Sequence, residues 1–259
     1  MISSTSNAKV KNIMNLKKSA KARKKEKCFL VEGPRMFFEI PKDRIEECYL
    51  TEEFEDKYAE ELKGWHYELI SENVCKHLSD TKTPQGVIAV VRRTEPSIEE
   101  LLHKEKNPCF FLLENLQDPG NLGTIVRTAE GAGVTGIIMN RETVDIYNPK
   151  TIRATMGSLY RMPFVYADDF CEAIGQAKAQ GIRLYAAHLK GRNNYDGEDY
   201  RQPSGFLIGN EGNGLTKEAA DSATDYIRIP MGGQLESLNA SVAAAVLMYE
   251  ANRQRRKEY

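Results

Sequence analysis

Residues 229–250 read IPMGGQLESLNASVAAAVLMYE, and the rest of the chain is best interpreted outward from them. The β-rich run Tyr226–Ile229 stops at a proline, and the glycine pair beyond it permits a tight turn or a close approach to a ligand. Ser237 and Asn239 are favoured N-cap residues, and the Ala/Val-rich run behind them predicts a long helix. Strand, turn and capped helix occur in any α/β domain. The loop is nevertheless long, and its short polar groups suit an anion at a helix N-terminus, so both interpretations stay open.

The sequence before this stretch alternates between strand-like and helix-like segments. We predict strands at residues 110–114, 136–139, 164–166, 183–187 and 205–208, and helices at 121–132, 151–159, 170–180 and 216–221. Such alternation is typical of a mainly parallel sheet covered by helices. Ligands of these sheets gather at the carboxyl ends of the strands.

Two further predicted strand ends are unusually polar. Residues 118–129, DPGNLGTIVRTA, place Asn121 near a helix N-terminus and Arg127 about a turn and a half further along. Residues 206–215, FLIGNEGNGL, combine three glycines, which leave backbone amides open to a ligand, with Glu211, a carboxylate able to fix an arginine. Three such segments at one sheet edge predict a binding or catalytic site there.

The N-terminal part predicts a smaller α/β unit. A basic helix over residues 3–27 precedes predicted strands at 28–32, 48–50, 67–70 and 87–91. The polar stretch over residues 92–108 then marks the boundary between two domains. We therefore predict an N-terminal domain over 1–95, a linker over 96–107 and a second domain over 108–259.

Composition narrows the class of protein. The chain has 259 residues, of which 41% are hydrophobic and 28% charged, as in soluble globular proteins. No apolar run approaches the roughly 20 residues of a membrane span, so we expect no membrane association. The five cysteines are scattered, odd in number and without CxxC spacing, and the four histidines are dispersed. This pattern predicts reduced thiols in the cytoplasm and no metal centre.

Charge is unevenly distributed although the net charge is only −1. Nine basic residues crowd the N-terminus with Glu26 as the only acid among them: Lys9, Lys11, Lys17, Lys18, Lys21, Arg23, Lys24, Lys25 and Lys27. The run is suited to nucleic-acid phosphates, and equally to a solvated helix face.

The three polar segments, in this order, resemble the signature motifs of the SpoU/TrmH family of RNA ribose 2′-O-methyltransferases, within the SPOUT class. The matching segments are 118–129, 208–215 and 229–243, and Gly157 with Arg161–Pro163 is similar to the family's connecting segment. The N-terminal segments 29–33 and 83–86 resemble, less specifically, the ribosomal-protein-like domain with which many members bind their substrate.

The resemblance implies an α/β C-terminal domain with a deep trefoil knot, S-adenosylmethionine bound by the knot loops, and an active site that forms across a homodimer. It implies that Gly209, Ile229 and Leu238 bind the cofactor, largely through backbone groups. It also implies a catalytic set of Arg127, Asn121, Glu211, Ser237 and Asn239. In this interpretation Arg127 positions the RNA and stabilises charge, Glu211 orients Arg127, and the ribose proton leaves to phosphate or water, because a guanidinium does not act as a base near neutral pH.

Two other classes of protein compete with this interpretation. A dinucleotide-binding enzyme fits poorly, because residues 209–214 do not follow the GxGxxG pattern. A non-catalytic RNA-binding protein of the same fold would be expected to have a damaged motif, whereas this one is complete. The resemblance allows ribosomal or transfer RNA as the substrate, and the separate N-terminal domain favours ribosomal RNA. We also predict that the helix after Asn239 forms the dimer interface, through Ala240, Ala243, Ala244, Ala245, Val246, Leu247 and Tyr249.

Overall fold

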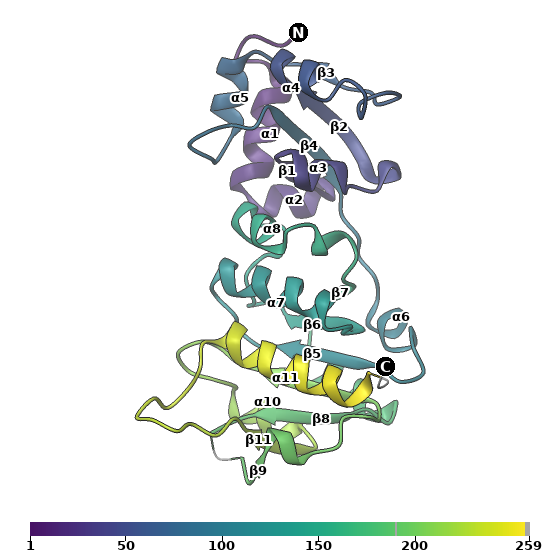
Figure 1. Cartoon of the computed structure of the whole chain (residues 1–259), viewed down its shortest axis with the longest axis vertical. Helices are drawn as coiled ribbons and strands as arrows, with labels where there is room; N and C mark the ends of the chain where they lie inside the picture. Colours follow the sequence, from purple (N-terminus) through teal and green to yellow (C-terminus); the bar gives the residue numbers. More distant parts are fainter. Residues whose placement is uncertain (190, 257–259) are drawn as a thin grey trace. The chain divides into compact units, whose positions relative to one another are not determined.

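The computed structural model describes residues 1–189 and 191–256, which form two compact units (Figure 1). The first unit contains Met1–Thr94 together with Asp145–Tyr160. The second contains Glu95–Val144 and the chain from Arg161 onward. This division differs from the predicted one, which was continuous in sequence: residues 145–160 belong to the first unit, and the predicted linker 96–107 belongs to the second.

The first unit is built on a four-stranded sheet in the order β1-β4-β2-β3. Its strands are β1 (Cys28–Glu32), β2 (Ile45–Leu50), β3 (Glu68–Leu69) and β4 (Val87–Arg92). β4 runs antiparallel to both neighbours, and β2 and β3 are parallel. The helical segments are α1 (Ala8–Lys18), α2 (Ala20–Glu26), α3 (Pro34–Phe38), η1 (Lys42–Arg44), α4 (Glu52–Lys57), α5 (Glu72–Leu78), α8 (Pro149–Thr155) and η2 (Ser158–Tyr160).

The predicted basic helix is two helices. Ser19 lies between them in an extended conformation, where its hydroxyl accepts a hydrogen bond from the Ala22 amide and starts α2. The apolar stripe of α1, formed by Val10, Ile13 and Leu16, is buried, as its spacing predicts.

Two of the basic residues have structural roles, which corrects their assignment to a phosphate-binding surface. Arg23 is only 4% exposed and pairs with Asp145, and Lys17 pairs with Asp80 and donates to the carbonyls of Leu78 and Ser79. Both charges are thus already engaged with partners inside the unit, Arg23 in a buried position and Lys17 in a partly exposed one. The exposed members of the run are Lys9, Lys11, Lys18, Lys21, Lys24, Lys25 and Lys27.

The second unit has, in its described residues, a seven-stranded sheet in the order β7-β6-β5-β10-β8-β11-β9, with every neighbouring pair parallel. The strands are β5 (Cys109–Leu113), β6 (Gly136–Asn140), β7 (Phe164–Ala167), β8 (Arg183–Ala187), β9 (Asn193–Asn194), β10 (Ser204–Ile208) and β11 (Asp225–Arg228). The helices are α6 (Ile98–Leu102), α7 (Pro119–Gly131), α9 (Phe170–Ala179), η3 (Tyr195–Gly197), α10 (Lys217–Ser222) and α11 (Ala240–Arg255).

Helices cover both faces of this sheet, so β5, β6 and β10 are buried along their whole length and are read as continuous apolar runs. On one face α6, α9 and α10 contribute to a cluster with strand residues such as Leu112, Ile138 and Leu207. α7 and α11 pack against each other, as Figure 1 shows. Because the strands are parallel, the segments that follow β5, β8, β10 and β11 all emerge at one edge of the sheet.

The predicted linker contains the helix α6, which begins with a capping box of Ser97 and Glu100. Its Leu101 and Leu102 are 2% and 5% exposed and belong to the core of the second unit. The prediction of a plain linker here missed this S-x-x-E signature.

In the described part of the chain, no helix has the length and apolar character needed to span a bilayer.

Candidate active site

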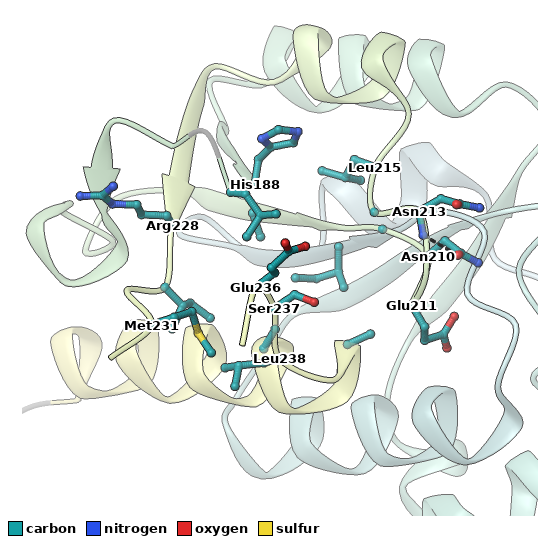
Figure 2. A pocket seen from close by; sticks show the side chains of 18 of the residues that line it. His188, Asn210, Glu211, Asn213, Leu215, Arg228, Met231, Glu236, Ser237 and Leu238 are labelled. Atoms are coloured by element: carbon teal, nitrogen blue, oxygen red, sulfur yellow. Dashed lines mark hydrogen bonds between the residues drawn. The ribbon is translucent and has the colours of Figure 1, made fainter. Parts of the chain in front are cut away.

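A cleft of about 620 Å³ opens at the carboxyl edge of the second unit's sheet (Figure 2). Three loops line it, following β8, β10 and β11, together with the first turn of α11. The lining residues are Ala187–Leu189, Ile208–Leu215, Arg228–Met231, Leu235–Leu238, Ala240 and Ala243. The volume lies within the range of small-molecule sites, which is roughly 300–1,000 Å³.

The loop after β10 is held closed by its own backbone and by Asn210. The Asn210 and Gly214 main chains exchange two hydrogen bonds of 3.0 and 2.9 Å, while Asn210 Oδ1 accepts from the amides of Gly212 and Asn213. At its start, an ideal Cβ on Gly209 would lie 2.1 Å from the Gly214 carbonyl carbon. Only glycine therefore fits at this point of the loop.

Glu114, directly after β5, fastens the far end of the same loop. Its carboxylate is 6% exposed and accepts hydrogen bonds from the Thr216 amide, at 2.8 Å, and the Thr216 hydroxyl, at 2.7 Å. The next residue, Asn115, has φ of 56° and accepts from Asn210 Nδ2 through its carbonyl. Glu114 was not among the predicted site residues, although an acid that directly follows an apolar strand was a signal for it.

A polar cluster joins the three motifs. Asn121 Nδ2 donates to Glu211 Oε1 at 3.0 Å, and Asn121 Oδ1 accepts from Asn239 Nδ2 at 3.1 Å and from the Ser241 hydroxyl at 3.3 Å. Asn239 is also the N-cap of α11, where Oδ1 accepts from the Ser241 and Val242 amides. The amide of Asn121 is thus oriented from both sides.

Glu211 lies at the N-terminus of α7, where its carboxylate accepts from the Gln117 and Asp118 amides as well as from Asn121. Partial burial acts to raise the pKa of Glu211, but the hydrogen bonds from Asn121 and the backbone outweigh it, so the pKa lies below its ordinary value. The group is ionised at neutral pH and does not hold a proton to give.

The structure places the predicted residues as follows. Gly209, Ile229, Leu238, Glu211 and Ser237 line the cleft. Asn121 and Asn239 join its edge through the polar cluster. Ser237 is in the loop before α11, and Asn239 alone of the two N-cap candidates caps the helix.

Arg127 lies on an exposed face of α7. Within residues 1–189 and 191–256 neither a hydrogen bond nor an ion pair joins it to Glu211, whose partners are Asn121 and the α7 backbone. Within one chain Glu211 is therefore held by Asn121 and the α7 backbone, and its predicted contact with Arg127 stays a prediction. The reason is the helix repeat: six residues separate Asn121 from Arg127, so the two side chains leave α7 on different faces.

The cleft also contains residues that the motifs did not predict. His188 and Leu189 follow β8, Arg228 ends β11, and Met231 and Glu236 belong to the loop beyond it; Figure 2 shows His188, Glu236 and Leu238 around the same opening. Their common signal was a place at the carboxyl end of a parallel strand or in the loop beyond it. In the described residues there is no group of three or more His, Cys, Asp or Glu side chains able to hold a metal ion.

The SpoU rRNA Methylase family matches residues 108–249, more than half of the chain. The chain belongs to this family. Its N-terminal residues 7–89 match the MRM3-like substrate binding domain.

Relatives of the SpoU family resemble this member over nearly its whole length. The 23S rRNA (guanosine(2553)-2′-O)-methyltransferase RlmP of Bacillus subtilis is 32% identical, over 96% of this chain and 97% of that protein. The SpoU methyltransferase AviRb of Streptomyces viridochromogenes, solved in complex with AdoMet, superposes with a TM-score of 0.87 at 28% identity, over 96% and 98% of the two chains. An AdoMet-bound rRNA methyltransferase of Sinorhizobium meliloti gives 0.85 at 31% identity, over 97% of each.

These likenesses confirm three predictions: membership of the SpoU/TrmH family, an α/β fold with a mainly parallel sheet and an N-terminal α/β domain, and an RNA (ribose-2′-O-) methyltransferase as the enzyme class.

Proposed function

We propose that this SpoU-family chain transfers a methyl group from S-adenosylmethionine to a ribose 2′-hydroxyl of ribosomal RNA. The observation that carries the proposal is the cleft, because all three loops that form it belong to the family's motifs or emerge beside them at one sheet edge. Two full-length structural neighbours are described with AdoMet bound, which supports the same donor here.

The residues of the cleft suit this cofactor. Ile208, Met231 and Leu238 provide apolar contact for an aromatic base, and the peptide groups around Gly209 and Ile229 provide donors and acceptors. Glu236 and the ionised Glu211 provide negative charge for a cationic ligand. S-adenosylmethionine, when bound, supplies a methyl group made electrophilic by a sulfonium. We assign Gly209, Ile229 and Leu238 to its binding.

The surrounding side chains would place the ribose for attack. We assign Asn121 and Asn239 to positioning, because their amides are already engaged with each other and with Glu211. Ser237 lines the cleft with a hydroxyl that has no hydrogen-bond partner among the described residues, so it is available to the ribose. Arg127, exposed on α7, would hold an RNA phosphate with its fork of donors, and the 2′-hydroxyl proton would pass to phosphate or water.

Ribosomal RNA is the favoured substrate. The RlmP relative, which spans almost the whole chain, is named for 23S rRNA, and the N-terminal unit matches a substrate-binding domain. A second relative, from Synechocystis, is 31% identical over 98% of this chain and is named as a tRNA/rRNA methyltransferase. Transfer RNA is therefore the alternative substrate.

We further propose that two copies pair through α11 and the exposed face beside it. Val242 and Tyr249 are 48% and 53% exposed, and because they are seven residues apart they lie on the same face of α11. The predicted set needs correction, because Ala240, Ala244 and Leu247 are buried within the unit and cannot contact a second copy. Sedimentation of a monomer at micromolar concentration would contradict this assembly.

The function is tested by incubating the protein with methyl-labelled S-adenosylmethionine and, separately, ribosomal RNA and transfer RNA. Label should enter ribosomal RNA, and the modified linkage should resist alkaline cleavage, because a methylated 2′-oxygen cannot attack the adjacent phosphate. Label in transfer RNA alone would show that transfer RNA, and not ribosomal RNA, is the substrate. RNA binding without any incorporation would instead support a non-catalytic RNA-binding protein.

A further inference from the structure

Residues 145–160, here called the anchor segment, lie in the first unit although the chain on both sides of them belongs to the second. The segment follows β6 and precedes β7, two adjacent strands of the second unit's sheet. The polypeptide therefore passes between the units three times, at 94–95, 144–145 and 160–161. A single linker would pass between them once.

Arg23 and Asp145 hold the start of the anchor segment. Arg23 Nε donates to Asp145 Oδ2 at 2.9 Å, and its Nη2 lies 2.7 Å from the same oxygen. The remaining guanidinium nitrogen donates to the carbonyls of Leu16 and Lys17. Each guanidinium nitrogen of Arg23 therefore has a partner, and the residue is only 4% exposed. Removal of Asp145 would leave a buried charge without its counter-charge, which is strongly destabilising.

Aromatic contacts continue along the segment. Tyr147 is 1% exposed, with its ring centroid 4.6 Å from that of Phe29 on β1 and the Arg93 guanidinium 4.5 Å above its ring. The Tyr147 hydroxyl donates to the Thr94 carbonyl and accepts from the Thr94 amide, both at 3.2 Å. These contacts bury the segment against the strand that starts the first unit's sheet.

The far end of the segment is fixed in the same way. The Tyr160 hydroxyl donates to the Met36 carbonyl at 3.1 Å, and Ile152 and Leu159 are each 2% exposed. Gly157 has φ of +99°, and an ideal Cβ there would overlap the Glu39 carboxylate. Ion pair, aromatic contact and apolar burial are thus spread over the whole segment.

We propose that the anchor segment ties the RNA-binding unit to the methyl-transfer unit without depending on the linker, and that Arg23 and Asp145 are positioning residues for the reaction on RNA. The proposal rests on the proposed RNA substrate only for its second half. RNA held by the first unit is then presented to the cleft at a raised effective concentration, because the two binding units cannot separate freely.

A cut chain tests the first half. A recognition sequence for a site-specific protease is inserted after Glu95, and the purified full-length protein is cleaved. Residues 1–95 should co-elute with the remainder on size exclusion, because the remainder carries the anchor segment. Separation of the two pieces in the wild-type sequence would overturn the proposal.

Three variants assign the effect to the ion pair. In Asp145→Lys a cation faces Arg23, so the dissociation constant of the two cut pieces should rise at least about a hundredfold. Asp145→Asn keeps the shape and an acceptor oxygen and should weaken association by a smaller factor. Asp168→Lys is the matched control, because it reverses an ion pair with Arg141 on an 89% exposed carboxylate. Equal association in all three variants and the wild type would remove Arg23 and Asp145 from the anchor.

The second half is tested on uncut protein with long ribosomal RNA and with a short oligonucleotide that contains the methylated nucleotide. Asp145→Lys should lower kcat/KM on the long RNA by about ten- to a hundredfold, mainly through KM, and leave the oligonucleotide within about twofold. S-adenosylmethionine affinity should stay unchanged and reports on the second unit's fold. Equal losses on both RNAs would refute the positioning role. If wild-type protein methylates no RNA, the proposed function fails, while the cut-chain result still decides the anchor.

Discussion

Gly209→Ala probes the closed loop on which the proposed cofactor site depends. The added methyl carbon would lie 2.1 Å from the Gly214 carbonyl carbon and the Leu215 amide nitrogen, and 2.4 Å from the Gly214 oxygen. All three atoms are backbone, so no side-chain rotation relieves the overlap. The loop must open, which breaks the paired hydrogen bonds between Asn210 and Gly214.

The magnitude follows from the cost of overpacking, about 1–3 kcal/mol. Without ligand, the Gly209→Ala protein relieves the overlap by opening the loop. A ligand that binds only the closed loop must close it again, so its binding free energy is weakened by the same amount of about 1–3 kcal/mol. At about 1.4 kcal/mol per factor of ten, we expect S-adenosylmethionine to bind roughly 5- to 150-fold more weakly.

Calorimetric titration with S-adenosylmethionine measures this loss. Gly212→Ala is the matched control from the same loop, because its Cβ would meet only Asn210 Oδ1, at an ordinary 3.5 Å. The control should bind within about twofold of wild type, since substitutions without strain change stability little. Normal affinity in Gly209→Ala would refute the closed-loop reasoning, as would an equal loss in both variants.

Three further outcomes are expected. Arg127→Ala should leave S-adenosylmethionine affinity within a few-fold but lower methyl transfer about 10³-fold, or about 4 kcal/mol, with poor rescue by lysine; near-normal turnover would remove Arg127 from the mechanism. Since hydrogen bonds hold the pKa of Glu211 below its ordinary 4.5, its carboxylate stabilises the fold above that pH, and the gain is lost as pH falls through the lowered value. The Tm of Glu211→Gln should therefore lie below that of wild type at pH 7 and converge with it in acid, and a constant gap would contradict this. Replacing the exposed Lys24 and Lys25 with alanine should weaken RNA binding and flatten its dependence on salt, whereas Lys17→Ala should mainly lower Tm; an unchanged salt slope would make the lysines a solvated helix face.

Local rules account for much of what could be predicted. The strand Arg183–Ala187 was predicted with its observed bounds, because buried parallel strands are short apolar runs between turns. The site segments followed from their motifs, and Asn239 capped its helix because a short polar side chain there reaches the free amides. The same rules should have found α6, whose Ser97 and Glu100 form a capping box. That miss was one of interpretation, since the signal was in the sequence.

Local rules could not tell which charges face solvent. Arg23 and Lys17 look like their exposed neighbours in the sequence, and only the folded chain brings Asp145 and Asp80 to them. The sequence likewise suggested Arg127 as the partner of Glu211, whereas within one chain the side-chain partner is Asn121, because the helix repeat points Asn121 and Arg127 in different directions.

The sequence by itself therefore determined the family, the alternation of strands and helices, and the chemical types gathered at one sheet edge. Tertiary structure alone decided that residues 145–160 join the first unit. Their burial there depends on partners more than 100 positions away in the chain, such as Arg23 for Asp145 and Phe29 for Tyr147. Periodicity and capping depend on neighbours within a few residues in the sequence. They therefore cannot indicate that a segment packs in one unit while the chain on both sides of it belongs to the other.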